Sequence, residues 1–197
     1  MQKTLAILAV TLSIFAPAVQ AGDDAEMHRN DIEVRGFSAG EPTARGYFET
    51  AITDDVALAL SAFKTRGWDE VTVGPTVYLT PEMSVGAGFG ASRYAAGGEN
   101  GKSAHRTASA FWFWKTDAWE AEALVERYAR DPAPWYAEGY VQKRIDDRLS
   151  VGLLAQKGSG WGPRFSYAID GNIEVWASPL VKRAGNVAAI VGAMVSF

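Results

Sequence analysis

Apolar and polar residues alternate one by one through much of the chain from Asp31 onward. The pattern is clearest in residues 71–80, 83–92, 119–126 and 187–197. A period of two places successive side chains on opposite faces of a β-strand, whereas an amphipathic helix needs a period of 3.6. No segment of this region has the helical period. The alternation therefore predicts an all-β fold.

Turn-forming residues interrupt the alternation at intervals of roughly a dozen residues. Asp54-Asp55 and Asp170-Gly171 are two of these interruptions. They predict about twelve strands, with ten possible if one hairpin is misread. The expected spans are 31–39, 43–53, 56–65, 70–79, 83–95, 103–115, 119–130, 135–145, 148–157, 162–169, 173–182 and 187–197. Consecutive antiparallel strands hide their edges completely when they close into an up-and-down barrel, so we expect one domain, a β-barrel over residues 31–197.

The first residues have the pattern of an export signal. Lys3 precedes a short apolar stretch, and Ala21 ends a segment of small residues that is typical of a cleavage site. We interpret residues 1–21 as a signal peptide. Residues 22–30 are acidic at their start and have no period, so they are expected to form a flexible N-terminal segment in the periplasm.

Alternation alone does not tell whether the apolar face of a barrel points inward, as in a soluble barrel, or outward to lipid. The aromatic residues favour the outward direction, because membrane barrels carry aromatic girdles at both interfaces. On the apolar face we expect two such groups near the two rims. They are Phe111, Phe113, Trp119, Tyr167 and Phe197 near one rim, and Trp135 and Trp161 near the other.

The last strand of the chain is amphipathic and ends on Phe197. Together with the signal peptide and the strand meander, this terminal strand resembles those of the bacterial outer-membrane β-barrel proteins. The resemblance implies a transmembrane barrel in the outer membrane of a Gram-negative cell envelope. It also implies insertion by the barrel-assembly machinery, with both chain ends in the periplasm.

Basic residues gather in one of the two sets of turns. Lys64, Arg66 and Arg93 belong to the set that the orientation above makes extracellular, whereas the periplasmic turns are mainly acidic. Arg and Lys pair with lipid phosphates. We therefore expect outer-membrane lipids, including lipopolysaccharide, as partners; a solvated loop face is the alternative.

The polar face carries nearly balanced charges that would line the lumen. The expected lumen-lining residues are Glu33, Arg35, Arg45, Glu49, Arg106, Glu120, Glu122, Glu126, Arg130, Glu138, Arg144, Arg164 and Glu174. Unpaired charges are costly in a confined lumen, so opposite charges are expected to pair. The carboxylates of residues 120–126 are expected to face Arg144 or Tyr140 on the next strand.

Three functions remain open. Twelve strands lie between a filled eight-stranded barrel and an open sixteen-stranded pore, so a narrow passive channel for polar solutes is the leading interpretation. A structural or accessory barrel with a closed lumen, serving envelope assembly or polysaccharide export, is the second. The third is a lipid-modifying hydrolase that uses His105, which shares a strand face with Thr107 and Ser109. This third function is the least favoured, because no acid is evident to orient the imidazole, and we assign no catalytic residue.

Composition excludes several other classes. The chain has no cysteine and two histidines, so we expect no disulfide, no metal site and no cofactor. The formal net charge of −4 makes nucleic acid an improbable partner. The sequence sets no oligomeric state.

Overall fold

The computed structural model describes residues 29–38, 41–95, 102–129, 135–182 and 185–197, which form a closed antiparallel barrel of twelve strands. The strands are β1 Asp31–Phe37, β2 Thr43–Thr53, β3 Val56–Lys64, β4 Trp68–Thr80, β5 Met83–Ala95, β6 Lys102–Lys115, β7 Trp119–Tyr128, β8 Trp135–Arg144, β9 Leu149–Gln156, β10 Gly160–Ala168, β11 Ile173–Val181 and β12 Val187–Ser196. Each expected strand is present, and its ends differ by no more than two residues from the expected ones. The predicted all-β barrel is therefore confirmed. The proposed signal peptide and nearly all of the expected flexible segment lie outside the described residues.

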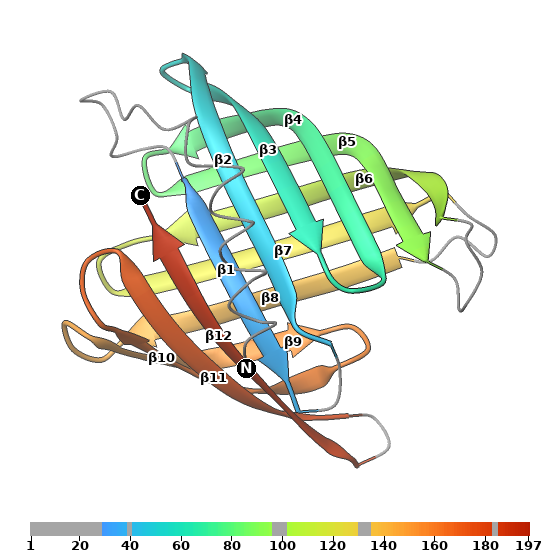
Figure 1. Cartoon of the computed structure of the whole chain (residues 1–197). Coiled ribbons are helices and arrows are strands. Elements are labelled where there is room, and N and C mark those ends of the chain that lie inside the picture. The colour runs from blue at the N-terminus through green and yellow to red at the C-terminus, as the bar shows by residue number, and fades with distance from the viewer. Residues whose placement is uncertain (1–28, 39–40, 96–101, 130–134, 183–184) are drawn as a thin grey trace.

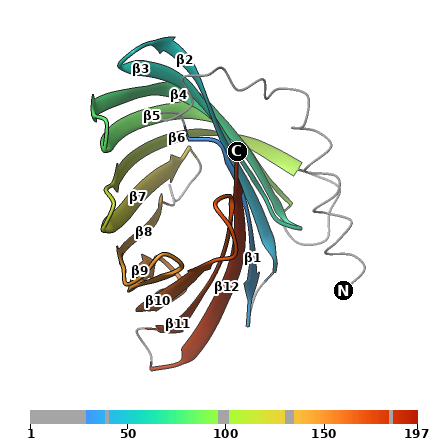
Figure 2. The ribbon, with the colours of Figure 1, turned by 90° about the vertical axis from the view of Figure 1, so that its left-hand side faces the viewer.

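Each strand pairs with its neighbours in the sequence, and β1 pairs with β12 to close the sheet (Figures 1 and 2). The closing ladder runs from Asp31 opposite Ser196 to Phe37 opposite Ile190. Closure leaves no strand with an unpaired edge, which removes the site at which an open sheet would aggregate. Within the described ranges, no helix is long and apolar enough to cross a membrane.

The barrel has two distinct ends. The start of β1, the end of β12 and the connections at 54–55, 81–82, 116–118, 145–148 and 169–172 lie at one end, which we call the turn end. The end of β1, the start of β2 and the connections at 65–67 and 157–159 lie at the other, which we call the loop end. Both ends of the barrel chain thus lie on one side, as an even number of strands requires.

Aspartates close two of the connections at the turn end. Asp146 Oδ1 accepts the backbone N–H groups of Arg148 (2.8 Å) and Leu149 (2.7 Å). Asp170 Oδ1 accepts two backbone N–H groups in the same way, from residues 172 and 173. These bonds mimic a backbone turn, which explains why Asp marks these breaks in the sequence. The same N–H groups stabilise the charged carboxylate and hold the pKa of Asp146 below its ordinary value.

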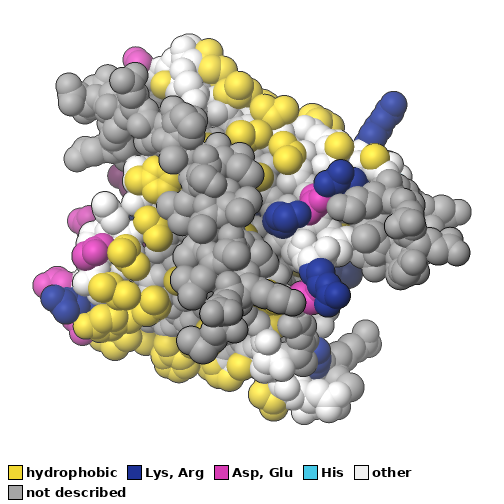
Figure 3. Space-filling model, in the orientation of Figure 1, with side chains coloured by type: hydrophobic (Ala, Val, Ile, Leu, Met, Phe, Trp, Pro, Cys, Tyr) yellow, Lys and Arg dark blue, Asp and Glu magenta, His cyan; other side chains and the backbone are white. Residues whose placement is uncertain are grey.

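The two faces of the wall have opposite character. Large apolar side chains on the outer face are exposed, including Leu58, Val73, Leu153 and Val191. Hydrophobic side chains are visible on the wall in Figure 3, mainly along its upper part and at the lower left. Charged side chains on the inner face are buried, among them Glu33, Arg35, Glu122, Glu138 and Arg164. This distribution is the reverse of that in a soluble barrel and fits an outer surface in contact with lipid.

Two local features let the strands accommodate unusual residues. The register places Pro163 in β10 opposite Pro179 in β11, so the two residues that lack an N–H donor share one gap in the ladder. Ser178 Oγ donates a hydrogen bond to the Pro163 carbonyl at 2.6 Å in this gap. On β5, a Cβ atom added to Gly86 would lie 2.2 Å from Phe111 Cζ. The glycine therefore lets the neighbouring ring lie flat against the inner wall, as expected for glycine on one face of a strand.

Candidate functional site

The interior of the barrel is the candidate functional site, and Arg35 lies at the centre of one of its ionic clusters. The guanidinium donates two hydrogen bonds to Glu138 across the barrel, at 2.6 and 2.7 Å, and one to Glu33 at 2.7 Å. Glu33 also accepts the indole N–H of Trp176 at 2.7 Å. All four side chains are buried. Because both Arg nitrogens meet both carboxylate oxygens, the pair has a fixed geometry that ties β1 to β8 through the lumen.

A second ionic cluster lies nearer the turn end, around Arg29. Its guanidinium pairs with Asp31 and donates to Glu122 at 2.7 Å. The same group lies 5.3 Å from the ring centre of Tyr47 and 4.9 Å from that of Phe113. The side chain of Arg29, two residues before the start of β1, thus points into the barrel. This contact was not predicted, because residues 22–30 were expected to be flexible.

Arg164 forms the third cluster. Its guanidinium lies between Tyr140 and Trp176, at 4.3 and 4.1 Å from the two ring centres. It also donates to Gln142 at 3.2 Å and to Glu174 at 3.2 Å. Stacking on two rings and pairing with one carboxylate compensate for the burial of this charge.

Beside this cluster, apolar side chains fill one sector of the interior. Leu154, Leu180 and Ile190 are almost completely buried and pack with Trp176. They come from β9, β11 and β12, so the apolar sector faces the inner wall of the last strands.

The opposite sector, on β3 to β6, carries small side chains. Ala59, Ser61, Thr72 and Ser109 line a cavity of about 20 Å³ there, and charged residues from β2 and β7 close its other side. Short side chains on one half of the wall leave space that a fully packed interior would fill.

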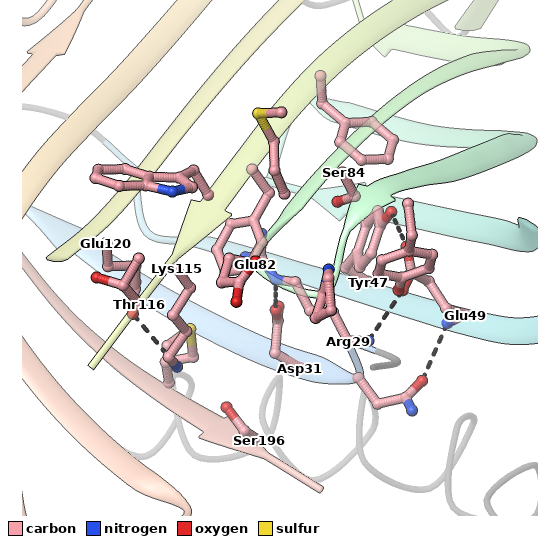
Figure 4. Close-up of a pocket in the computed structure, with 18 of the residues that line it drawn as sticks. Arg29, Asp31, Tyr47, Glu49, Glu82, Ser84, Lys115, Thr116, Glu120 and Ser196 are labelled. Carbon is pink, nitrogen blue, oxygen red and sulfur yellow. Dashed lines mark hydrogen bonds and ion pairs between the residues drawn. The ribbon is translucent and has the colours of Figure 1, made fainter. Parts of the chain in front are cut away.

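A wider cavity of about 760 Å³ opens at the turn end, and we call it the vestibule. Figure 4 shows Arg29, Asp31, Glu49 and Glu120 around it, with Lys115 paired to Glu120. Its charged lining contains both signs, but the acidic side chains of Asp31, Glu49, Glu82, Asp117 and Glu120 outnumber the basic ones of Arg29, Lys115 and Arg144.

Tyr47 and Phe111 line both the vestibule and the small cavity. Their rings meet edge to face, with centres 5.4 Å apart. Tyr47 is held in place because its hydroxyl donates to Glu49 Oε1 at 2.7 Å. We call these two rings the aromatic neck, since they separate the two cavities.

The structure places most of the expected lumen-lining residues inside the barrel. Those whose side chains face the interior are Glu33, Arg35, Arg45, Glu49, Glu120, Glu122, Glu126, Glu138, Arg164 and Glu174. Arg144 faces the same side but is exposed at the turn-end rim. Arg130 lies outside the described residues. As expected, the Tyr140 hydroxyl binds Glu120, donating at 2.6 Å.

The assignment of Arg106 to the lumen is wrong. Thr107, its neighbour, is buried on the inner face, and alternation therefore places the exposed Arg106 on the outer wall. Asp31 and Glu70 are additional buried carboxylates that were not predicted. Both share the alternation of inner residues on their strands, and this pattern could have identified them.

The expected interface aromatics divide into two groups. Trp119, Trp135, Trp161, Tyr167 and Phe197 are exposed on the outer wall near the ends of their strands. Phe111 and Phe113 were also expected there, and this expectation is wrong: both rings lie inside, against Tyr47 and Arg29. The polar residues of β6 at 105, 107 and 109 share their face, so this face is the inner one.

His105 also lies on the inner face. It is opposite Ser92 in the β5–β6 ladder, and the Ser92 side chain is buried. A hydrolase that attacks lipids from the membrane would need its hydroxyl and imidazole on the outer wall. Among the described residues, no group of three His, Cys, Asp or Glu side chains could hold a metal ion.

No protein-family model matches the chain, and neither does any curated protein sequence. Solved structures with the same fold are nevertheless found. Outer membrane phospholipase A from Escherichia coli is 11% identical, with a TM-score of 0.53 over 85% of this chain and 92% of that one. The KdgM porin in complex with disordered oligogalacturonate is 14% identical, with a TM-score of 0.51 over 86% and 99%. The outer membrane protein Omp33 from Acinetobacter baumannii is 13% identical, with a TM-score of 0.50 over 87% and 98%. The chain therefore has the fold of bacterial outer-membrane β-barrel proteins.

Proposed function

We propose that this chain is an outer-membrane barrel that forms a narrow passive channel for small polar solutes. The observation that carries the proposal is the wide vestibule at the turn end, which shares Tyr47 and Phe111 with the small cavity deeper in the barrel. One matched structure is a porin by name, which supports the same function. The turn end would face the periplasm. The N-terminal leader would direct export of the chain, and the barrel-assembly machinery would insert the barrel into the outer membrane.

Conductance across a planar bilayer tests the channel. The purified barrel should give small, steady current steps with a weak preference for cations, because acidic side chains outnumber basic ones in the vestibule lining. A closed structural barrel is the second candidate, favoured by the ionic clusters and by the small volume of the middle cavity. Absence of current above the protein-free background would contradict the channel and support the closed barrel.

Phe111→Ala should raise the single-channel conductance, by at least about twofold, because the narrowest part of a pore sets its resistance. The matched control is Phe89→Ala. Phe89 is also a phenylalanine, on the neighbouring strand, but its ring is 69% exposed on the outer wall. The Phe89→Ala substitution should leave the conductance unchanged. Equal conductance of both variants and the unmodified barrel would show that the current does not pass the aromatic neck.

A further inference from the structure

Three arginines form a diagonal row on the outer wall near the loop end. Arg93 on β5 pairs in the ladder with Ala104, two residues before Arg106 on β6. Arg106 in turn lies two residues before Ala108, the ladder partner of Arg127 on β7. Diagonal neighbours of this kind are about 7–8 Å apart on one face of a sheet. We call these three residues the arginine row.

The positive charges of the arginine row are poorly compensated within the protein. Arg93 donates to Asp69 at 2.7 Å, but Asp69 also pairs with Lys64. Arg106 and Arg127 form no ion pair or hydrogen bond with any side chain of the described residues. Neighbouring like charges repel each other, so an external anion would stabilise this part of the wall. In Figure 3, most of the Lys and Arg side chains in view lie toward the loop end.

The surroundings of the row are apolar. Small residues, Ala91 and Ala104, flank Arg106 on the same face. Toward the middle of the wall, Phe89 is 69% exposed and Val71 is 50% exposed. On the other side, Arg127 faces the exposed indole of Trp135 across the β7–β8 ladder. A free inorganic anion needs none of this apolar surface, whereas a lipid would cover it with its acyl chains.

We propose that the arginine row binds the phosphate groups of a phosphorylated glycolipid, such as lipopolysaccharide, in the outer leaflet. The guanidinium groups donate charge-assisted hydrogen bonds to the phosphates, and the acyl chains pack over the alanines and Phe89. The inference rests on the proposed outer-membrane location. It assigns a lipid site to one sector of the wall, β5 to β7, and not to the whole rim.

The test is native mass spectrometry of the purified barrel in detergent, titrated with lipid A that carries two phosphates. The unmodified barrel should retain the lipid. The Arg106→Gln/Arg127→Gln variant should bind it at least about tenfold more weakly, which corresponds to about 1.4 kcal/mol. The matched control, Lys143→Gln/Arg148→Gln, removes two exposed cations at the turn end and should bind like the unmodified barrel.

Several results would overturn the lipid site. One is that the unmodified barrel does not retain lipid A. Another is that the two double variants bind lipid A equally well. Displacement of lipid A by an equal concentration of inorganic phosphate would instead show a site for a free anion. Heat-dependent gel migration and conductance are measured on the same samples. If both are normal while lipid binding is unaffected by the arginines, the lipid site is wrong and the channel proposal stands.

Discussion

Replacing Arg35 with alanine is expected to lower the unfolding free energy of the barrel by about 3–5 kcal/mol, because the change leaves two buried carboxylates without their partner. Glu138 and Glu33 accept three hydrogen bonds from this guanidinium, and both are at least nine-tenths buried. Water cannot replace the lost donor at such a site without entering the packed interior. Urea-induced unfolding of the barrel from lipid vesicles measures the change.

Arg148→Ala is the matched control for this substitution. Arg148 lies exposed in a connection at the turn end, where its side chain donates to the Tyr167 hydroxyl, at 3.3 Å. Its loss should change the unfolding free energy by less than about 0.5 kcal/mol. If Arg35→Ala had an equally small effect, the arginine and its carboxylates would have to be hydrated, and the interior would be open at that level.

Val73→Arg is expected to destabilise the barrel in lipid by about 2–4 kcal/mol, because a cation near the middle of a lipid-facing wall must be buried in hydrocarbon. Val73 lies near the centre of β4 and is 46% exposed on the outer face. In a soluble barrel the same substitution would place the arginine in water, at little cost. Unfolding curves of the variant and of the unmodified barrel, recorded in lipid vesicles, measure the difference in unfolding free energy.

The control for this prediction is Val187→Arg, which places the same residue type at the first position of β12, near the loop end. A cation at the interface costs only about 0–1 kcal/mol, because its side chain reaches the headgroups. The loss of unfolding free energy should therefore be clearly larger for Val73→Arg than for Val187→Arg. Equal, small effects at both positions would contradict a lipid-facing wall.

The strands and their order could be predicted from the sequence because the relevant signals are local. Alternation identifies a strand from its own residues, and Asp146 or Asp170 marks a turn by binding the backbone two residues on. Closure follows from the number of strands and the need to protect edges. These features require no knowledge of distant contacts.

The partners of the interior charges could not be predicted in the same way. Arg35 and Glu138 are 103 residues apart and meet across the lumen, so their pairing depends on the shape of the closed barrel. Arg29 lies before the first strand, where no alternation gives its direction. By contrast, the wrong faces assigned to Phe111 and Arg106 could have been avoided. The polar residues of β6 identify its inner face, whereas the aromatic character of a residue does not tell which face it is on.

Migration of the purified barrel on a gel, with and without boiling after refolding into lipid vesicles, tests most directly the claim that the apolar wall faces lipid. We expect the unboiled sample to stay folded in detergent and to run as a compact band, which shifts to the position of the unfolded chain on heating. A protein that remains soluble and monomeric without detergent or lipid, and shows no such shift, would contradict the account.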